Sequence, residues 1–301
     1  MSAGRAVSKK RIVWWNNKLL PEDEVCISPF DRGLLYGDGL FETLRAENGQ
    51  PLYVTDHWKR LREAAIQLRF FDKGDENATW VCLESPWVWR ERISAVLKRN
   101  GLHQGIARVK ILLTRGPISG VGLPRSTTPT IGILAEPYTP PSSEEYDRGW
   151  TLCTLSKGWT PPTAAMKTLN YLFYLWARQQ ALDAGYDESL IYDKDGRMAE
   201  TATGNLLFLT EGHCAVSASP YRLKGTTEGR LVELLREDGW IVEEKDLQEK
   251  DLSNFHAVWM TNALLGIMPI RAIDGRPLPR LLGFEASRYR DLFFRRGLQD
   301  P

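Results

Sequence analysis

The chain has 301 residues, of which 43% are hydrophobic and 26% charged, and its formal net charge at pH 7 is +1. This length suits one large domain or two medium ones, and the composition is that of an ordinary soluble globular protein. A net charge so near zero argues against a nucleic-acid or membrane-surface role driven by bulk electrostatics.

Strands and helices are predicted to alternate in the N-terminal half. Asn48-Gly49 is a hairpin signal between two strand candidates, Gly39–Ala46 and Pro51–Val54. A helix to about Leu68 follows, with Thr55 as its expected N-cap. A second helix is expected to begin at Ser85-Pro86, and further strands are expected at Arg11–Trp15, Val109–Thr114 and Thr130–Ala135.

The clearest boundary is Glu136–Arg148, which is rich in proline, serine and charge and is typical of an exposed connection. We therefore expect an N-terminal domain over residues 1–137, a linker over 138–148 and a second domain over 149–301. The second domain is predicted to hold strands at Trp150–Leu155, Ser189–Tyr192, Asn205–Leu209, Ile241–Glu244 and Ala257–Thr261, and helices at Asn170–Ala184, Thr227–Glu237 and Phe284–Arg295.

Cysteines and histidines are dispersed along the chain. Cys26, Cys82, Cys153 and Cys214 form no CxxC pair, and the four histidines form neither HExxH nor His-x-His. This spacing predicts no metal site and no disulfide framework, which favours a reducing compartment. Because no apolar run has the length of a signal peptide or a membrane span, we expect a cytoplasmic protein without a membrane partner.

Lys167 is the first candidate for chemistry. It follows a Pro/Thr-rich loop and precedes an aromatic-rich helix, and its neighbours are small or apolar. Partial desolvation lowers the pKa of a lysine and makes the free amine available for imine formation. A surface lysine before a helix explains the same local sequence, so both interpretations stay open at this point.

Three other segments could bind charged groups. Glu200 follows a hairpin turn, where it could pair with a buried cation or lie exposed at a strand edge. Lys224–Thr227 precedes a helix whose first N–H groups could bind an anion, although a threonine N-cap after a loop glycine explains it equally well. Arg60 could bind a phosphate through two contacts or be a solvated arginine among basic neighbours.

Taken in chain order, seven segments resemble the class IV (fold type IV) pyridoxal 5′-phosphate (PLP) enzymes. This family includes branched-chain aminotransferases, D-amino acid aminotransferases and 4-amino-4-deoxychorismate lyases. The resemblance implies an α/β (α+β) two-domain fold, with a smaller N-terminal and a larger C-terminal α/β domain, the cofactor between them, and a homodimer. The segments are Asp31–Arg45, His57–Leu61, Thr114–Gly116, Lys167–Leu172, Glu200–Asn205, Leu223–Thr227 and Met260–Pro269.

The resemblance also implies roles for individual residues. Lys167 matches the catalytic lysine that holds PLP as a Schiff base, and Glu200 matches the partner of the pyridine nitrogen. The other implied cofactor-binding residues are Arg60, Thr226 and Thr227 at the phosphate, Tyr171 near the C3 oxygen, and Asn262 in a loop that lines the pocket. Tyr36, Phe41 and Arg115 are implied to contact a small-molecule amine substrate.

Within the family, Thr261–Leu264 followed by Gly266–Pro269 looks most like the lyases. After Thr114–Gly116, however, Ser119–Pro124 replaces the Arg-Gly-Tyr of many lyases. We expect a PLP-dependent lyase that converts 4-amino-4-deoxychorismate to 4-aminobenzoate and pyruvate in folate biosynthesis. The alternative is an aminotransferase for D-amino acids or branched-chain amino acids. A PLP carrier without turnover is a third interpretation, which the set of Lys167, Glu200 and Arg60 disfavours.

Overall fold

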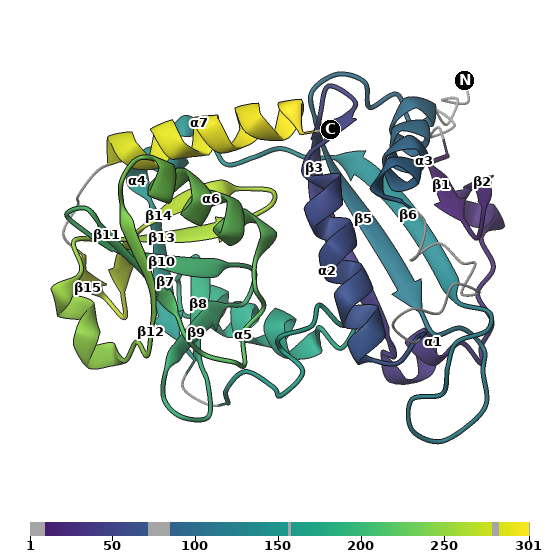
Figure 1. Ribbon diagram of the computed structural model, residues 1–301, viewed down its shortest axis with the longest axis horizontal. Coiled ribbons are helices and arrows are strands. Elements are labelled where there is room, and N and C mark those ends of the chain that lie inside the picture. Colours follow the sequence, from purple (N-terminus) through teal and green to yellow (C-terminus); the bar gives the residue numbers. More distant parts are fainter. Residues whose placement is uncertain (1–9, 72–84, 156–157, 279–282, 301) are drawn as a thin grey trace, which may run out of the picture. The chain divides into compact units, whose positions relative to one another are not determined.

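The computed structural model describes residues 10–71, 85–155, 158–278 and 283–300. Backbone contacts divide the chain into two compact units, Met1–Tyr138 (unit 1) and Thr139–Pro301 (unit 2). Each unit combines one sheet with helices, as Figure 1 shows, so the expected α/β architecture in two parts is present. Cys82 lies outside the described residues, and Cys26, Cys153 and Cys214 are free thiols.

Unit 1 holds a six-stranded antiparallel sheet in the order β2-β1-β6-β5-β3-β4. Helices α2 and α3 contact each other and the same sheet, and Figure 1 shows them on one of its faces. The elements are β1 (Ile12–Trp15), β2 (Lys18–Pro21), the 3-10 helix η1 (Glu22–Glu24), α1 (Arg32–Tyr36), β3 (Gly39–Glu47), β4 (Gln50–Pro51), α2 (Val54–Gln67), α3 (Pro86–Arg99), β5 (Ile106–Thr114) and β6 (Thr130–Pro137).

The turn between β3 and β4 is the hairpin that the sequence predicts. Asn48 and Gly49 have φ values of 48° and 81°, the left-handed conformation that a two-residue hairpin of this type requires. On the sheet face beneath the helices, Leu61 and Ala65 of α2 and Ile93 of α3 are buried. The helical spacing of Leu61 and Ala65 is the pattern that predicted α2, whereas α3 was predicted from its start at Ser85-Pro86.

One local prediction for unit 1 is wrong, and the predicted linker contains a helix that the sequence did not reveal. The N-cap of α2 is Tyr53, not Thr55, because Tyr53 adopts φ 52° and turns the chain into the helix directly after β4. Within residues 138–148, which we predicted as an exposed linker, Ser143–Arg148 forms helix α4. Ser142 caps this helix by accepting from the N–H of Glu145 at 3.2 Å, and Tyr146 is buried in the core of unit 2.

Unit 2 holds a nine-stranded mixed sheet in the order β12-β11-β10-β13-β14-β7-β8-β9, with β15 paired to β14. Its sheet curls, so that β9 approaches β10 and β11. Besides α4 the elements are β7 (Trp150–Thr154), α5 (Leu172–Asp183), β8 (Glu188–Tyr192), β9 (Met198–Thr201), β10 (Asn205–Thr210), β11 (His213–Ser217), α6 (Thr226–Glu237), β12 (Ile241–Lys245), η2 (Glu249–Asn254), β13 (Ala257–Asn262), β14 (Gly266–Ile273), β15 (Arg276–Pro277) and α7 (Gly283–Gln299).

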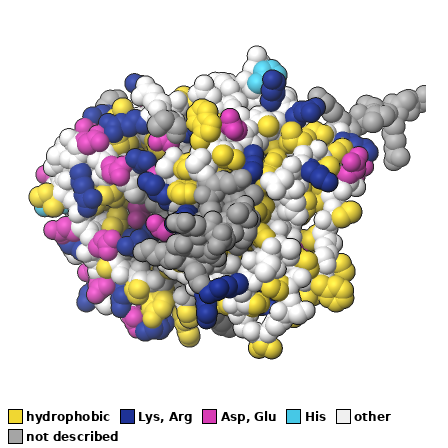
Figure 2. Space-filling model, turned by 45° about the vertical axis from the view of Figure 1, so that its right-hand side comes forward, with side chains coloured by type: hydrophobic (Ala, Val, Ile, Leu, Met, Phe, Trp, Pro, Cys, Tyr) yellow, Lys and Arg dark blue, Asp and Glu magenta, His cyan; other side chains and the backbone are white. Residues whose placement is uncertain are grey.

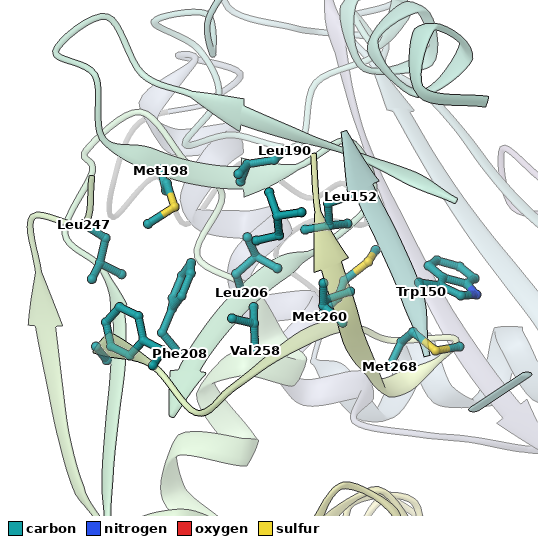
Figure 3. Close-up of a cluster of buried hydrophobic side chains, with 14 of the residues drawn as sticks. Trp150, Leu152, Leu190, Met198, Leu206, Phe208, Leu247, Val258, Met260 and Met268 are labelled. Carbon is teal, nitrogen blue, oxygen red and sulfur yellow. The ribbon is translucent and has the colours of Figure 1, made fainter. Parts of the chain in front are cut away.

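The core of unit 2 lies inside this curled sheet. Figure 3 shows Leu152, Leu190, Leu206 and Met260, from four different strands, turned toward one another. All four are at most 2% exposed. A core packed this closely makes the strand positions rigid. It therefore fixes Glu200 on β9, Asn262 at the end of β13, and the segments after β7 and β11 that hold the other candidate residues of unit 2.

Two further features concern the surface. On the face shown in Figure 2, basic and acidic side chains are interspersed, in agreement with the net charge of +1. Among the described residues, no helix has both the length and the apolar character that crossing a bilayer requires.

Candidate functional site

Lys167 lies in the loop between β7 and α5 and is half-buried. Its Nζ is 5.5 Å from the centroid of the Tyr171 ring, a cation–π distance. The amine is also close enough to Glu200 to lower the pKa of that carboxyl. The Lys167 amine and the Glu200 carboxylate therefore interact electrostatically, while the catalytic role of Lys167 stays a prediction.

Glu200 lies on β9 and is only 4% exposed, so the exposed strand-edge interpretation is wrong. Oε1 accepts from the hydroxyl of Tyr174 at 2.8 Å, and Oε2 accepts from the N–H of Leu223 at 3.0 Å. Burial raises the pKa of Glu200 to about 7, and these two neutral donors and Lys167 offset only part of the effect. A buried carboxylate in this state is suited to a cationic N–H partner.

Tyr171 is the N-cap residue of α5, and its hydroxyl donates to the carbonyl of Ala202 at 2.8 Å. A phenol has only one proton to donate, and in Tyr171 this proton is used in the hydrogen bond to Ala202. The lone pairs of the phenol oxygen can still accept a hydrogen bond. Burial and the charge of Glu200 raise the pKa of Tyr171 above its ordinary value, so it stays protonated. Its expected role near a C3 oxygen stays a prediction.

The turn before α6 is the candidate anion site. The cap residue is Gly225, and no side chain among the described residues caps the first turn, so the threonine N-cap interpretation is wrong. Thr226 and Thr227 are the first two residues of α6, where backbone N–H groups lack partners within the helix. A Cβ at Gly225 would meet Oδ1 of Asn205 at 2.1 Å, so the backbone here needs glycine.

Asn262, at the end of β13, connects two loops. Its Nδ2 donates to the carbonyl of Thr203 at 3.2 Å, and its Oδ1 accepts from the N–H groups of Leu264 and Leu265 at 3.0 and 2.9 Å. Thr203 in turn donates to Oε2 of the buried Glu188 at 2.6 Å. Asn262 thus holds the loops that flank Glu200, while its own contact with a cofactor stays a prediction.

In unit 1, Arg60 lies on α2 and is held by Glu42 of β3. The Nε of Arg60 donates to Oε1 at 2.7 Å, and a terminal nitrogen donates to Oε2 at 2.6 Å. The Nδ1 of His57 lies 2.7 Å from the same Oε2. Burial alone would raise the pKa of Glu42, but Arg60 and His57 outweigh it and lower this pKa to about 2. Arg60 is therefore part of an ordered charged cluster and is not a freely solvated side chain.

The three predicted substrate residues lie in different environments of unit 1. Tyr36, at the end of α1, is 62% exposed, whereas Phe41 on β3 is buried. Arg115 is fully buried, and its guanidinium donates to Oδ2 of Asp38 at 2.8 Å and to the carbonyls of Leu68, Arg69 and Pro124. With these donors engaged inside the unit, Arg115 holds three segments of chain together.

Within unit 2, the structure brings Lys167, Tyr171 and Glu200 together, and the N–H of Leu223 connects Glu200 to the turn before α6. Sequence reasoning missed Tyr174, which donates to Glu200. A signal was present, because Tyr171 and Tyr174 are three residues apart at the start of a helix and so share one face. Among the described residues there is no cluster of His, Cys, Asp or Glu that could hold a metal ion.

The chain is an α/β protein in two parts, and its second part holds a buried carboxylate near a lysine and a helix that begins at a glycine turn. The family model for amino-transferase class IV matches residues 39–273, and the chain belongs to this family. Membership makes the protein a PLP-dependent enzyme of the class IV aminotransferase family.

Individual relatives are consistent with this assignment. A Methanocaldococcus jannaschii protein, named provisionally as a branched-chain-amino-acid aminotransferase, is 32% identical over 88% of each chain. The aminodeoxychorismate lyase of Bacillus subtilis is 26% identical over 87% of each chain. The T.th. branched-chain amino acid aminotransferase, solved with pyridoxamine 5′-phosphate, superimposes with a TM-score of 0.82, covers 97% of this chain and 95% of that chain, and is 24% identical. The fold is therefore the expected fold type IV.

The residues present fit PLP. The two hydrogen bonds that the buried Glu200 carboxylate accepts from Tyr174 and Leu223 come from neutral donors. A protonated ring nitrogen would give this carboxylate a positively charged donor. The glycine turn at Gly225 and the first turn of α6 provide backbone donors for a phosphate. For the reaction itself, the relatives favour the aminotransferase alternative over the expected lyase, because the Methanocaldococcus jannaschii protein is more similar to this chain than the Bacillus subtilis lyase.

Proposed function

We propose that the protein is an aminotransferase that moves the amino group of a branched-chain amino acid to a keto acid. The observation that carries this proposal is the electrostatic interaction of the half-buried Lys167 amine with the buried Glu200 carboxylate in unit 2, where the amine lowers the pKa of that carboxyl. The similarity to the Methanocaldococcus jannaschii protein supports the choice of amino acid.

The cofactor, when bound, supplies an electron sink that stabilises negative charge at the substrate α-carbon. Lys167 Nζ would accept the proton from that carbon and, as an ammonium group, donate a proton later in the same half-reaction. Partial burial favours this exchange, because it disfavours the charged amine. The ring of Tyr171 would support the charged form when it arises, since its face lies 5.5 Å from Nζ.

Glu200 would hold a proton at the ring nitrogen, which keeps the ring cationic. The first N–H groups of α6, with Thr226 and Thr227, would bind the phosphate. We assign Arg60 to the phosphate as well, as the resemblance implies. Its two hydrogen bonds to Glu42 fix the direction of the guanidinium, which supports a binding role.

The lyase reaction is the second candidate. It is supported by the Bacillus subtilis relative and by the segment Thr261–Leu264, which looks most like that of the lyases. The two reactions share the use of Lys167 as acid and base and differ in the fate of the substrate. A lyase needs no keto acid, whereas an aminotransferase without one stops after the first half-reaction.

We also propose a homodimer in a reducing, cytoplasmic setting, which the resemblance and the free thiols of Cys26, Cys153 and Cys214 support. Light scattering on the purified protein tests the dimer. A molecular mass equal to that of a single chain of 34.3 kDa would contradict it.

The proposed function is tested by steady-state assays of the PLP-loaded protein. Leucine, isoleucine and valine, each with 2-oxoglutarate, are compared with D-alanine and with 4-amino-4-deoxychorismate. We expect continuous keto-acid formation from the branched-chain substrates only when 2-oxoglutarate is present, and no more than one keto acid per bound cofactor without it. Continuous release of pyruvate and 4-aminobenzoate without a keto acid would reject the proposal in favour of the lyase.

A further inference from the structure

We infer that Tyr174 is a positioning residue whose hydroxyl orients the Glu200 carboxylate and keeps it ionised for the ring nitrogen of the cofactor. The inference rests on the proposed role of Glu200. Tyr174 lies on α5, seven residues after Lys167. It lies outside the segments that resemble the class IV enzymes.

The first observation is that the two oxygens of Glu200 are held separately. Oε1 accepts from Tyr174 at 2.8 Å, from helix α5. Oε2 accepts from the N–H of Leu223 at 3.0 Å, from the turn before α6. Two donors on different elements fix the plane of the carboxylate, and removal of either one frees its rotation.

The second observation is that Tyr174 is itself held rigidly. Its ring stacks on Tyr171 at a centroid distance of 5.0 Å and an interplanar angle of 27°, and it meets the edge of Phe173 at 5.3 Å. It also packs against the buried cluster that contains Ala177 and Ile191. The hydroxyl is thus positioned by packing and does not depend on Glu200 for its place.

The third observation concerns charge. Burial dominates the pKa of Glu200 and raises it, while the hydrogen bond from Tyr174 lowers it. Burial and the neighbouring carboxylate raise the pKa of Tyr174, so the phenol stays protonated and remains a donor at every pH at which the enzyme works. Because a carboxylate accepts this bond better than a carboxylic acid does, Tyr174 favours the ionised form of Glu200.

The test compares Tyr174→Phe with Tyr289→Phe, a matched control that removes another tyrosine–carboxylate hydrogen bond of unit 2, from Tyr289 to Asp238 at 2.8 Å. The carboxyl carbon of Glu200 is titrated by NMR in the full-length, cofactor-free chain, with Glu200→Gln used to assign the signal. We expect a pKa near 7 in the parent chain. In Tyr174→Phe we expect it to rise by roughly one pH unit. Tyr289→Phe should leave it unchanged.

A second variant guards against loss of folding in Tyr174→Phe. Fluorotyrosine placed at position 174 keeps the shape but is a stronger donor, so the pKa of Glu200 should fall. In the PLP-loaded protein, the acid limb of the pH profile should move in the same direction as this pKa, with kcat changed more than KM. An unchanged Glu200 titration in both variants would overturn the inference. A shifted titration in a protein without transamination would reject the proposed function and leave this inference standing.

Discussion

Arg60 donates two hydrogen bonds to Glu42, at 2.7 Å to Oε1 and at 2.6 Å to Oε2, in the interior of unit 1. This fork-to-carboxylate geometry fixes the guanidinium more firmly than a single contact could. The arginine that the sequence assigns to the cofactor phosphate therefore depends on a buried glutamate for its orientation.

The first prediction concerns the stability that Glu42 provides. Its folded-state pKa of about 2 lies below the ordinary value of 4.5, so its contribution is present above pH 4.5 and is lost as the pH falls toward 2. We expect Glu42→Gln to lower the free energy of unfolding at pH 7 by on the order of 3 kcal/mol. Urea unfolding at pH 7 and at pH 3 measures this.

The matched control for this prediction is Glu136→Gln, which removes an exposed partner of Arg108 on the same sheet. A surface ion pair contributes little, so we expect almost no change in unfolding. Equal losses at both pH values in Glu42→Gln would contradict the ionic account of this cluster.

The second prediction concerns Glu200, whose pKa is shifted in the opposite direction. Its folded pKa of about 7 exceeds the ordinary 4.5, so its contribution to stability is present below pH 4.5 and is lost as the pH rises through 7. The cofactor-free parent chain should lose roughly 3 kcal/mol between pH 5 and pH 8 through this group. Glu200→Gln should lack that loss, and parallel stability curves by calorimetry would reject the assignment. The same variant should retain PLP but lose most turnover.

The third prediction concerns the turn before α6. Gly225→Ala places a Cβ only 2.1 Å from Oδ1 of Asn205, so the turn or the asparagine must shift. We expect PLP binding to weaken by at least tenfold, roughly the loss of one good hydrogen bond. Fluorescence titration with PLP measures the dissociation constant.

Gly229→Ala is the control for the turn, since a Cβ there meets nothing within 4 Å and α6 gains a better helix former. Its PLP affinity should equal that of the parent chain. Equal affinities in both variants would show that the phosphate does not lie at this turn.

Periodicity predicted the elements that bury one face. The predicted bounds of α2 and α6 lie within two residues of the observed ones, and the apolar positions of α2 recur at helical spacing. For α3 only the start was predicted, from Ser85-Pro86, and it matches the structure. Strands β9, β11 and β14 were missed. β9 is buried at every position, and β11 and β14 are buried at most of theirs, so none shows the alternation of a half-exposed strand.

For the site, the sequence predicted roles for Lys167 and Glu200 but not the neighbours that set the charge state of Glu200. The contacts from Tyr174 and Leu223 to Glu200 join residues 23 or more positions apart, a distance that no local pattern reports. The environment of Arg115 is also one that no local pattern reports. Its motif suggested a substrate contact, yet the fold encloses its guanidinium among backbone carbonyls.

The central claim is that the amine of Lys167 holds the cofactor. Borohydride reduction of the PLP-loaded protein fixes the cofactor to that amine, and peptide mass spectrometry then locates it. We expect the added mass on the peptide that contains Lys167, and we expect Lys167→Ala to lose both the visible absorbance of the bound cofactor and the activity. Labelling of a different lysine in the parent chain, or an unchanged visible band in Lys167→Ala, would contradict the account.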